Sequence, residues 1–289
     1  MKKIYLLYML LTVSCSNISQ ANELDCPKDS ASVNAFNNFI LYDESIANDP
    51  LKEASVKTIS KNGYLTGDMK VTFDNCGALL TLEGREIKKS ENNGRVLISD
   101  SRVNLTKAVK DWDYEYVFKM MIVDENGEKS DLMQQKMKGK YETDETGKIN
   151  KATDVSDVEF ADESVTGKSE TSIVVNKDGK LSELKRRSTL NEDNSTKKYF
   201  YDQNGRLIKT ETDSGSDEFF YDEAGRELSM KSIKALFTAE LSTTTCKEWN
   251  EHGRCTKAEL NAATVFKGEN GKENKIVKNH ADILFNYKY

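Results

Sequence analysis

Short segments of this chain alternate between apolar and polar residues, as strands with one buried face do. In residues 114–120 the apolar side chains occupy every second position, and residues 283–289 at the C-terminus repeat the pattern. Threonine, lysine and glutamate fill many of the intervening positions. The pattern predicts an all-β fold, a mainly antiparallel hairpin meander with one wet face. Residues 28–39 and 233–241 are the two candidates for short helices.

Glycine turns separate these segments. Seven of them follow the pattern Asp/Asn/Ser-x-x-Gly, opening at Ser60, Asp124, Asp144, Asn176, Asp202, Asp222 and Asn250. A type I turn favours such a polar residue at its first position, because the side chain accepts a nearby backbone N–H. Glycine suits the fourth position, which is left-handed when a bulge closes the hairpin. We therefore expect hairpin tips, with Gly205, Gly225 and Gly253 closing the turns opened by Asp202, Asp222 and Asn250.

The same pattern with a less regular opening occurs at Gly94 and Gly271. Between successive turn glycines there is room for two strands and a return turn. No stretch rich in proline and glycine divides the chain, so residues 28–289 are interpreted as one β-rich domain. The acidic, weakly apolar residues 154–169 are a candidate flexible connection and the only soft boundary.

The N-terminus carries a targeting signal. Lys2 and Lys3 precede an apolar run over residues 4–13, which is the length of a secretory signal and too short to span a membrane. One interpretation removes residues 1–14 at a relaxed lipobox and leaves Cys15 as a lipidated first residue. The alternative removes residues 1–21 after Ala21. In the first case residues 15–27 form a tether between the membrane and the domain.

Composition narrows the function. The chain is 37% apolar and 31% charged, with a formal net charge of −6. Removal of the signal, which contains only Lys2 and Lys3 as charged residues, makes it more acidic still. A protein this acidic is repelled by phosphate backbones, so nucleic acid is not an expected partner.

Secretion places the remaining thiols, Cys26, Cys76, Cys246 and Cys255, in an oxidising compartment where two disulfides can form. Cys246 and Cys255 flank the turn at Asn250, and a bulged hairpin brings such positions opposite each other. We therefore predict Cys246–Cys255, which leaves Cys26 for Cys76. In the rival interpretation Cys26 is a free thiol near the tether.

The chain offers little catalytic chemistry. His252 lies in a predicted turn and His280 is isolated near Asp282. Acidic residues such as Asp213, Asp217 and Asp222 lack the spacing of a calcium loop, so no metal or cofactor is expected. An outer-membrane barrel is a minor interpretation, because the alternating strands are polar on both faces.

Two resemblances follow from these residues. Residues 201–207 and 221–226, and in degenerate form 249–254, resemble YD (RHS-type) repeats. Over most of the mature chain the sequence resembles the YnfC-like lipoproteins of enterobacterial envelopes, a family of unassigned function. The resemblance rests on residues 32–36, 75–80 and 201–208, on the C-x8-C spacing after Cys246 and on the tyrosine-terminated ending. It implies lipidation at Cys15 and, with Ser16 following, sorting to the outer membrane; it implies no catalytic residues.

The expected function is therefore that of a non-enzymatic envelope lipoprotein. Its membrane contact would be the N-terminal lipid, and its β surface would meet an unknown envelope protein or glycan. One alternative is a soluble periplasmic or secreted module that binds sugar or peptide on its aromatic face. The other is a hydrolase that uses two carboxylates.

Overall fold

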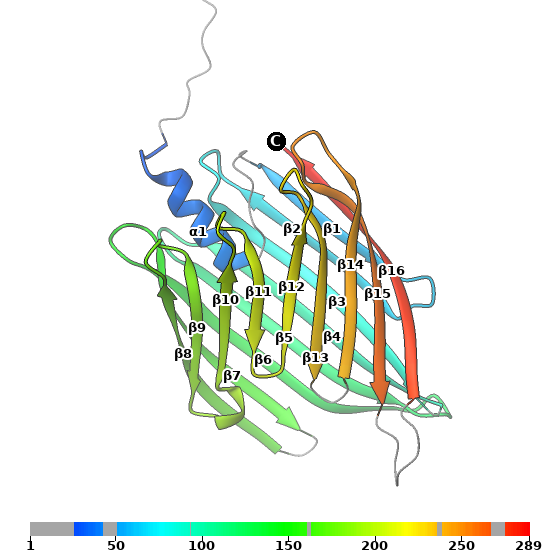
Figure 1. The fold of residues 1–289 in the computed structure, drawn as a ribbon. Helices are drawn as coiled ribbons and strands as arrows, with labels where there is room; N and C mark the ends of the chain where they lie inside the picture. The colour runs from blue at the N-terminus through cyan, green and yellow to red at the C-terminus, as the bar shows by residue number, and fades with distance from the viewer. Residues whose placement is uncertain (1–25, 43–50, 93, 161–162, 236–238, 267–274) are drawn as a thin grey trace, which may run out of the picture.

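The structure, a computed structural model, describes residues 26–42, 51–92, 94–160, 163–235, 239–266 and 275–289. It is a closed barrel of sixteen antiparallel strands with one α-helix among the described residues (Figure 1). The strands are β1 (Glu53–Ile59), β2 (Leu65–Phe73), β3 (Leu79–Asn92), β4 (Arg95–Lys107), β5 (Trp112–Val123), β6 (Lys129–Thr143), β7 (Ile149–Phe160), β8 (Glu163–Val175), β9 (Leu181–Ser188), β10 (Ser195–Tyr201), β11 (Leu207–Thr212), β12 (Gly215–Tyr221), β13 (Glu227–Ala235), β14 (Ala239–Trp249), β15 (Cys255–Phe266) and β16 (Lys275–Lys288).

The connectivity is the predicted meander. Each strand pairs with the next in sequence, and β1 pairs with β16, where Glu53 lies opposite Lys288 and Ile59 opposite Asp282. The all-β antiparallel prediction is therefore confirmed. The closure goes beyond the main prediction, in which a barrel was only a minor interpretation: instead of an open sheet with one wet face, every strand has a neighbour on both sides.

Strand alternation sorts side chains between the inside and the outside of the barrel. On β5, Trp112 belongs to the main core cluster, which also holds Tyr42 of the helix, and Tyr114 packs against that cluster. Their strand neighbours Asp113 and Glu115 lie on the opposite, outward face. The aromatic face that the sequence indicates is therefore the inner face of the barrel.

The helix α1 (Ser30–Tyr42) lies in the mouth of the barrel at one end. Its start and end are shifted by two or three residues from the predicted range of 28–39. Phe36 and Phe39 pack against a cluster on β9–β11, whereas Leu41 and Tyr42 pack against β1–β5 and β7. Because α1 contacts opposite walls, it plugs this end.

Two adjacent asparagines fix α1 to the barrel. Asn37 Nδ2 donates to Gly147 O at 2.8 Å, and its Oδ1 accepts from Ile149 N at 2.8 Å. Asn38 makes the same pair of contacts with Gly77 O (2.7 Å) and Leu79 N (3.0 Å). Both side chains are buried, so these amides satisfy backbone groups that would otherwise lose water without a partner.

The core lies behind this plug. Its main cluster contains Tyr42, Leu51, Ala54, Val71, Phe73, Leu79, Leu82, Leu105, Trp112 and Ile149. Towards the other end, a polar contact joins the two walls: Glu240 of β14 accepts from Tyr64 Oη at 2.8 Å and forms an ion pair with Lys88 of β3. The barrel is thus packed with apolar residues at the α1 end and held by an ion pair farther along.

Two sequence predictions are wrong. Residues 233–241 do not form a helix, because their described parts belong to β13 and β14. The described parts of residues 154–169 do not connect two units, because they belong to β7 and β8, which pair with each other from Lys151–Ser172 to Phe160–Glu163. Their polarity reflects strands whose outer face is in water.

The contacts of α1 predict the effect of losing one amide. Asn38→Ala leaves Gly77 O and Leu79 N buried without a partner, so we expect the free energy of unfolding to fall by about 2–3 kcal/mol. Ser32→Ala, on the exposed side of α1, should change it by less than about 0.5 kcal/mol. Urea titration followed by circular dichroism measures both. Equal stability of the two variants would contradict the role of α1 as an anchored plug.

Candidate functional site

Six Asx-type turns lie at the α1 end of the barrel. They connect β2–β3, β6–β7, β8–β9, β10–β11, β12–β13 and β14–β15. In the turn opened by Asp202, its Oδ1 accepts from Asn204 N and Arg206 N, both at 2.9 Å, and Gly205 has φ +77°. Gly225 (φ +80°) and Gly253 (φ +74°) take the same conformation. The hairpin tips expected at these positions are present.

One turn of this kind was missed. Asp74 accepts from Cys76 N and Ala78 N, and Gly77 has φ +79°. Its signal, Asp-x-x-Gly, is present in the sequence at Asp74-Asn75-Cys76-Gly77. Gly271, in contrast, lies outside the described residues.

Basic and aromatic residues link neighbouring turns. In four turns the residue after the glycine lies over an aromatic ring farther along the chain, which precedes the next turn in three of them and belongs to β16 in the fourth. The pairs are Lys180 over Tyr201, Arg206 over Tyr221, Arg226 over Trp249 and Arg254 over Tyr287, at 4.6–5.4 Å from the ring centroids. Three of these rings also bind backbone, since their hydroxyls donate to Leu181 O, Leu207 O and Cys255 O. The YD-like residues are therefore a structural ladder along this end of the barrel.

The hydroxyl of Tyr221 stays protonated in this ladder. Burial, together with the nearby Glu227, raises its pKa to about 12, against the opposing effect of Arg206. A neutral phenol keeps the proton that it donates to Leu207 O. The group thus acts as a hydrogen-bond donor to the backbone.

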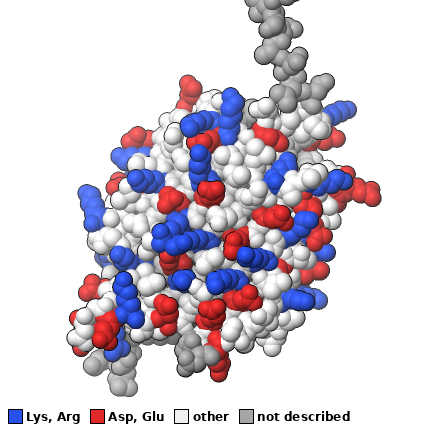
Figure 2. Space-filling view, turned by 180° about the vertical axis from the view of Figure 1, so that it is seen from behind, with Lys and Arg blue, Asp and Glu red and all other residues white. Residues whose placement is uncertain are grey.

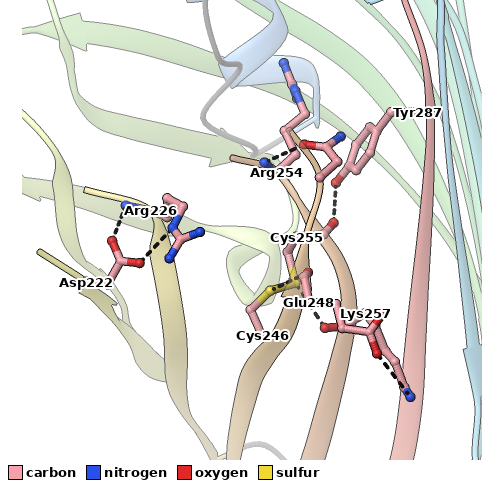
Figure 3. Close-up of a disulfide and its surroundings, with 9 residues drawn as sticks. Asp222, Arg226, Cys246, Glu248, Arg254, Cys255, Lys257 and Tyr287 are labelled. Carbon is pink, nitrogen blue, oxygen red and sulfur yellow. Dashed lines mark hydrogen bonds and ion pairs between the residues drawn. A yellow bond between two sulfur atoms is a disulfide. The ribbon is translucent and has the colours of Figure 1, made fainter. Parts of the chain in front are cut away.

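The disulfides have the expected pairing. Cys26 bonds to Cys76 with a Cα–Cα distance of 5.6 Å, and Cys246 bonds to Cys255 at 5.8 Å. The first joins the chain before α1 to the β2–β3 turn. The second joins β14 and β15 (Figure 3), near a turn where bulges shift the register of the two strands. Cys15, the expected lipidation site, lies outside the described residues.

The histidines and acids considered in the sequence do not converge. His252 stacks on Tyr289 with ring centroids 3.8 Å apart, and His280 faces Asn261 and Asp282 on the outer surface. Asp217 accepts from Thr210, and Asp222 pairs with Arg226. Within the described ranges no group of three or more metal-ligating side chains occurs.

One buried ion pair was not anticipated. Asp154 of β7, fully buried, accepts from Arg186 Nη2 of β9 at 2.8 Å and from Tyr114 Oη of β5 at 3.0 Å. Burial raises the pKa of the Tyr114 hydroxyl, and the Asp154 carboxylate raises it further. Burial alone would lower the pKa of Arg186, but Asp154 raises it. The carboxylate is thus occupied by donors, which suits a structural role.

A hollow of about 750 Å³ lies on the outer face of β6–β9. We call it the β6–β9 groove. Four cations contribute to its lining: Lys138, Lys140, Lys168 and Arg187. It carries no residue singled out in the sequence as a candidate site.

Comparisons with known proteins add little. No protein-family model matches the chain, and a search of curated proteins finds no match. Among solved structures, a porin-like protein from Bacteroides uniformis aligns over 83% of this chain and 98% of its own, with 12% identity and a TM-score of 0.44. That score is too low to transfer a property to this chain. In the part that the structure describes, no helix is long and apolar enough to cross a membrane.

The turn geometry predicts a graded cost of replacing glycine. Gly63 and Gly205 both have positive φ, but only at Gly205 would a side chain collide with the Lys180 ammonium, which donates to Gly205 O at 2.7 Å. We expect Gly63→Val to destabilise by about 1–2 kcal/mol through the left-handed backbone. Gly205→Val should cost about 0.5–1.5 kcal/mol more for the lost hydrogen bond. Urea unfolding measures both, and a Gly205→Val variant as stable as the parent would contradict the turn.

The turn carboxylates predict a pH dependence. The Arg206 backbone N–H and guanidinium lower the pKa of Asp202, and Arg226 does the same for Asp222. A carboxyl whose folded-state pKa lies below its unfolded value of about 3.9 stabilises the fold above that pH. This contribution is lost as pH falls through the folded pKa.

We therefore expect the melting temperature to fall less between about pH 5 and about pH 3 in Asp202→Asn/Asp222→Asn than in the parent. Asparagine keeps the Oδ1 acceptor, as Asn250 does in its own turn, but it does not titrate. Thermal melts followed by circular dichroism at several pH values provide the measurement. Parallel curves for the two proteins would show that these carboxylates contribute nothing to acid sensitivity.

Proposed function

We propose that this protein is a non-enzymatic lipoprotein of the bacterial cell envelope. A lipid on Cys15 would hold its plugged barrel at a membrane, and the barrel's outer face would meet an envelope partner. The observation that carries the proposal is the character of that outer face.

Charged residues are spread over the outer wall, between exposed apolar side chains such as Phe220, Ile233 and Leu241. The outward positions of β5 and β6 include Asp113, Glu115, Lys119, Lys136 and Lys138, and Figure 2 shows acidic and basic side chains interspersed over the whole visible face. A barrel that spans a membrane instead presents an apolar band about 25 Å tall to the lipid. A wall of this composition favours a barrel that stands in water.

A barrel that stands in water needs a separate means of reaching the membrane. The Cys26–Cys76 disulfide fixes Cys26, where the described chain starts, at the α1 end of the barrel. Cys15 precedes Cys26 by eleven residues. A lipid on Cys15 would therefore hold the α1 end towards the membrane, with the rest of the barrel projecting away. The resemblance to the YnfC-like lipoproteins supports this placement, and Ser16 favours the outer membrane.

The side-chain arrangement supports a binding role over catalysis. Asp154 is saturated by Arg186 and Tyr114, and the two histidines lie apart on the surface. One other candidate serves as an outcome of the test: a soluble periplasmic or secreted module cleaved after Ala21.

Lipidation can be tested on the protein made in a Gram-negative host. We expect the wild-type N-terminal peptide to carry a lipid mass at Cys15 and the protein to partition into detergent, because one acyl-modified terminus confers membrane affinity. Cys15→Ser should abolish both, whereas Ala21→Leu, the matched change at the rival cleavage site, should alter neither. A wild-type mature chain that begins unmodified at Asn22 would refute the anchor and favour the soluble module.

A further inference from the structure

We propose that the β6–β9 groove binds an anionic polysaccharide. This deepens the proposed function by naming the class of envelope partner, and it rests on that function for the compartment in which the polymer is met. Four cations, two threonines and one carboxylate on four adjacent strands carry the inference.

Strand register arranges these residues as a grid on the outer face. In one row Lys140 lies opposite Thr153, Thr153 opposite Glu170, and Glu170 opposite Arg187. In the next row Lys138 lies opposite Val155 and Val155 opposite Lys168, whose backbone N–H donates to Thr189 Oγ1 at 3.0 Å. With strands about 4.8 Å apart, the four strands span about 14 Å, which is wide enough for an extended polymer.

The charges of the grid are only partly neutralised. Lys138 pairs with Glu115 at 3.4 Å and Lys140 with Asp111 at 3.0 Å, and both carboxylates lie on the β5 side. For Lys168 and Arg187, both exposed, the described chain supplies no carboxylate within ion-pair distance. In a chain with a net charge of −6, this grid of four cations and one carboxylate is a local positive field.

The groove suits a hydrated polyanion better than a folded protein. Within the groove, β7 and β8 are paired on both sides, so it offers no open strand edge to which a partner could add a strand. The residues that line the groove include no aromatic side chain, and three of its four cations are lysines, which are depleted from protein interfaces. A free guanidinium at Arg187 can form a bidentate contact with a carboxylate, and the threonine hydroxyls can bind sugar hydroxyls.

Titration calorimetry of the full mature protein with polygalacturonate, which carries a carboxylate on each sugar, tests the proposal. We expect binding that weakens as salt is added and that falls at least about tenfold in Lys168→Glu/Arg187→Glu. Lys57→Glu/Lys278→Glu makes the same change of charge on the outer face of β1 and β16, and it should bind within about twofold of the parent. Thermal melting of both variants establishes that each is folded.

Three results would overturn the proposal: no binding by the parent, an equal loss in the two double variants, or tighter binding of poly-L-glutamate than of polygalacturonate. The second would mean that only net charge matters, and the third that an acidic peptide occupies the groove. Since the assay uses purified protein in solution, its outcome does not depend on modification at Cys15. Polysaccharide binding can therefore be refuted while lipidation at Cys15 is confirmed, or be confirmed while lipidation is refuted.

Discussion

The hydrogen bonds between the first and the last strand govern the rest of this structure. When β1 pairs with β16, the meander becomes a cylinder, and the two faces of the sheet become an inside and an outside. Each strand then has a hydrogen-bonded neighbour on both sides, so that short unpaired stretches, such as the start of β8, replace the long open edges through which sheets aggregate. Closure also concentrates the inward aromatic residues into a volume that a helix of thirteen residues can fill at one end.

The two faces of the barrel wall differ in polarity, although the outer wall also exposes apolar side chains such as Phe200, Ile233 and Ile276. Trp112, Tyr114 and Leu82 point inward and pack with the helix, while the outer wall carries lysines and acids that pair across strands. Exposed pairs of this kind add little stability. Their effect is to keep the outer wall hydrated, so the fold depends on its inner apolar cluster, on α1 and on the ladder of turns.

Local features could be predicted from the sequence because their causes are local. Asp202 and Gly205 define their turn through contacts within five residues, and the disulfide of Cys246 and Cys255 follows from the hairpin between them. Closure and the docking of α1 depend on pairs far apart in the chain, such as Asn37 with Ile149, and no short-range pattern contains them. The groove was missed for the same reason: Lys138 and Arg187 meet only through the register of four strands.

The errors have a common physical origin. Strands with a wet outer face contain so many polar residues that β7 and β8 were predicted to be a flexible connection. The end of β13 and the start of β14 lie close together in sequence, and their apolar residues were predicted to form a short helix. Asp154 illustrates the difficulty. An acidic residue in a polar stretch gives no sign that it is buried against Arg186 on a strand two positions away.

The Cys26–Cys76 disulfide also determines how the barrel bears mechanical load. It joins the chain to the β2–β3 turn at a point that precedes α1. A pull on the chain N-terminal to Cys26 is therefore transmitted through the two sulfur atoms into the wall of the barrel. The segment from Pro27 to Tyr42 lies outside that line of force, so the amide contacts of Asn37 and Asn38 carry no tension. Reduction of the bond would place α1 in series with the load, and the plug would become the first element that force extracts.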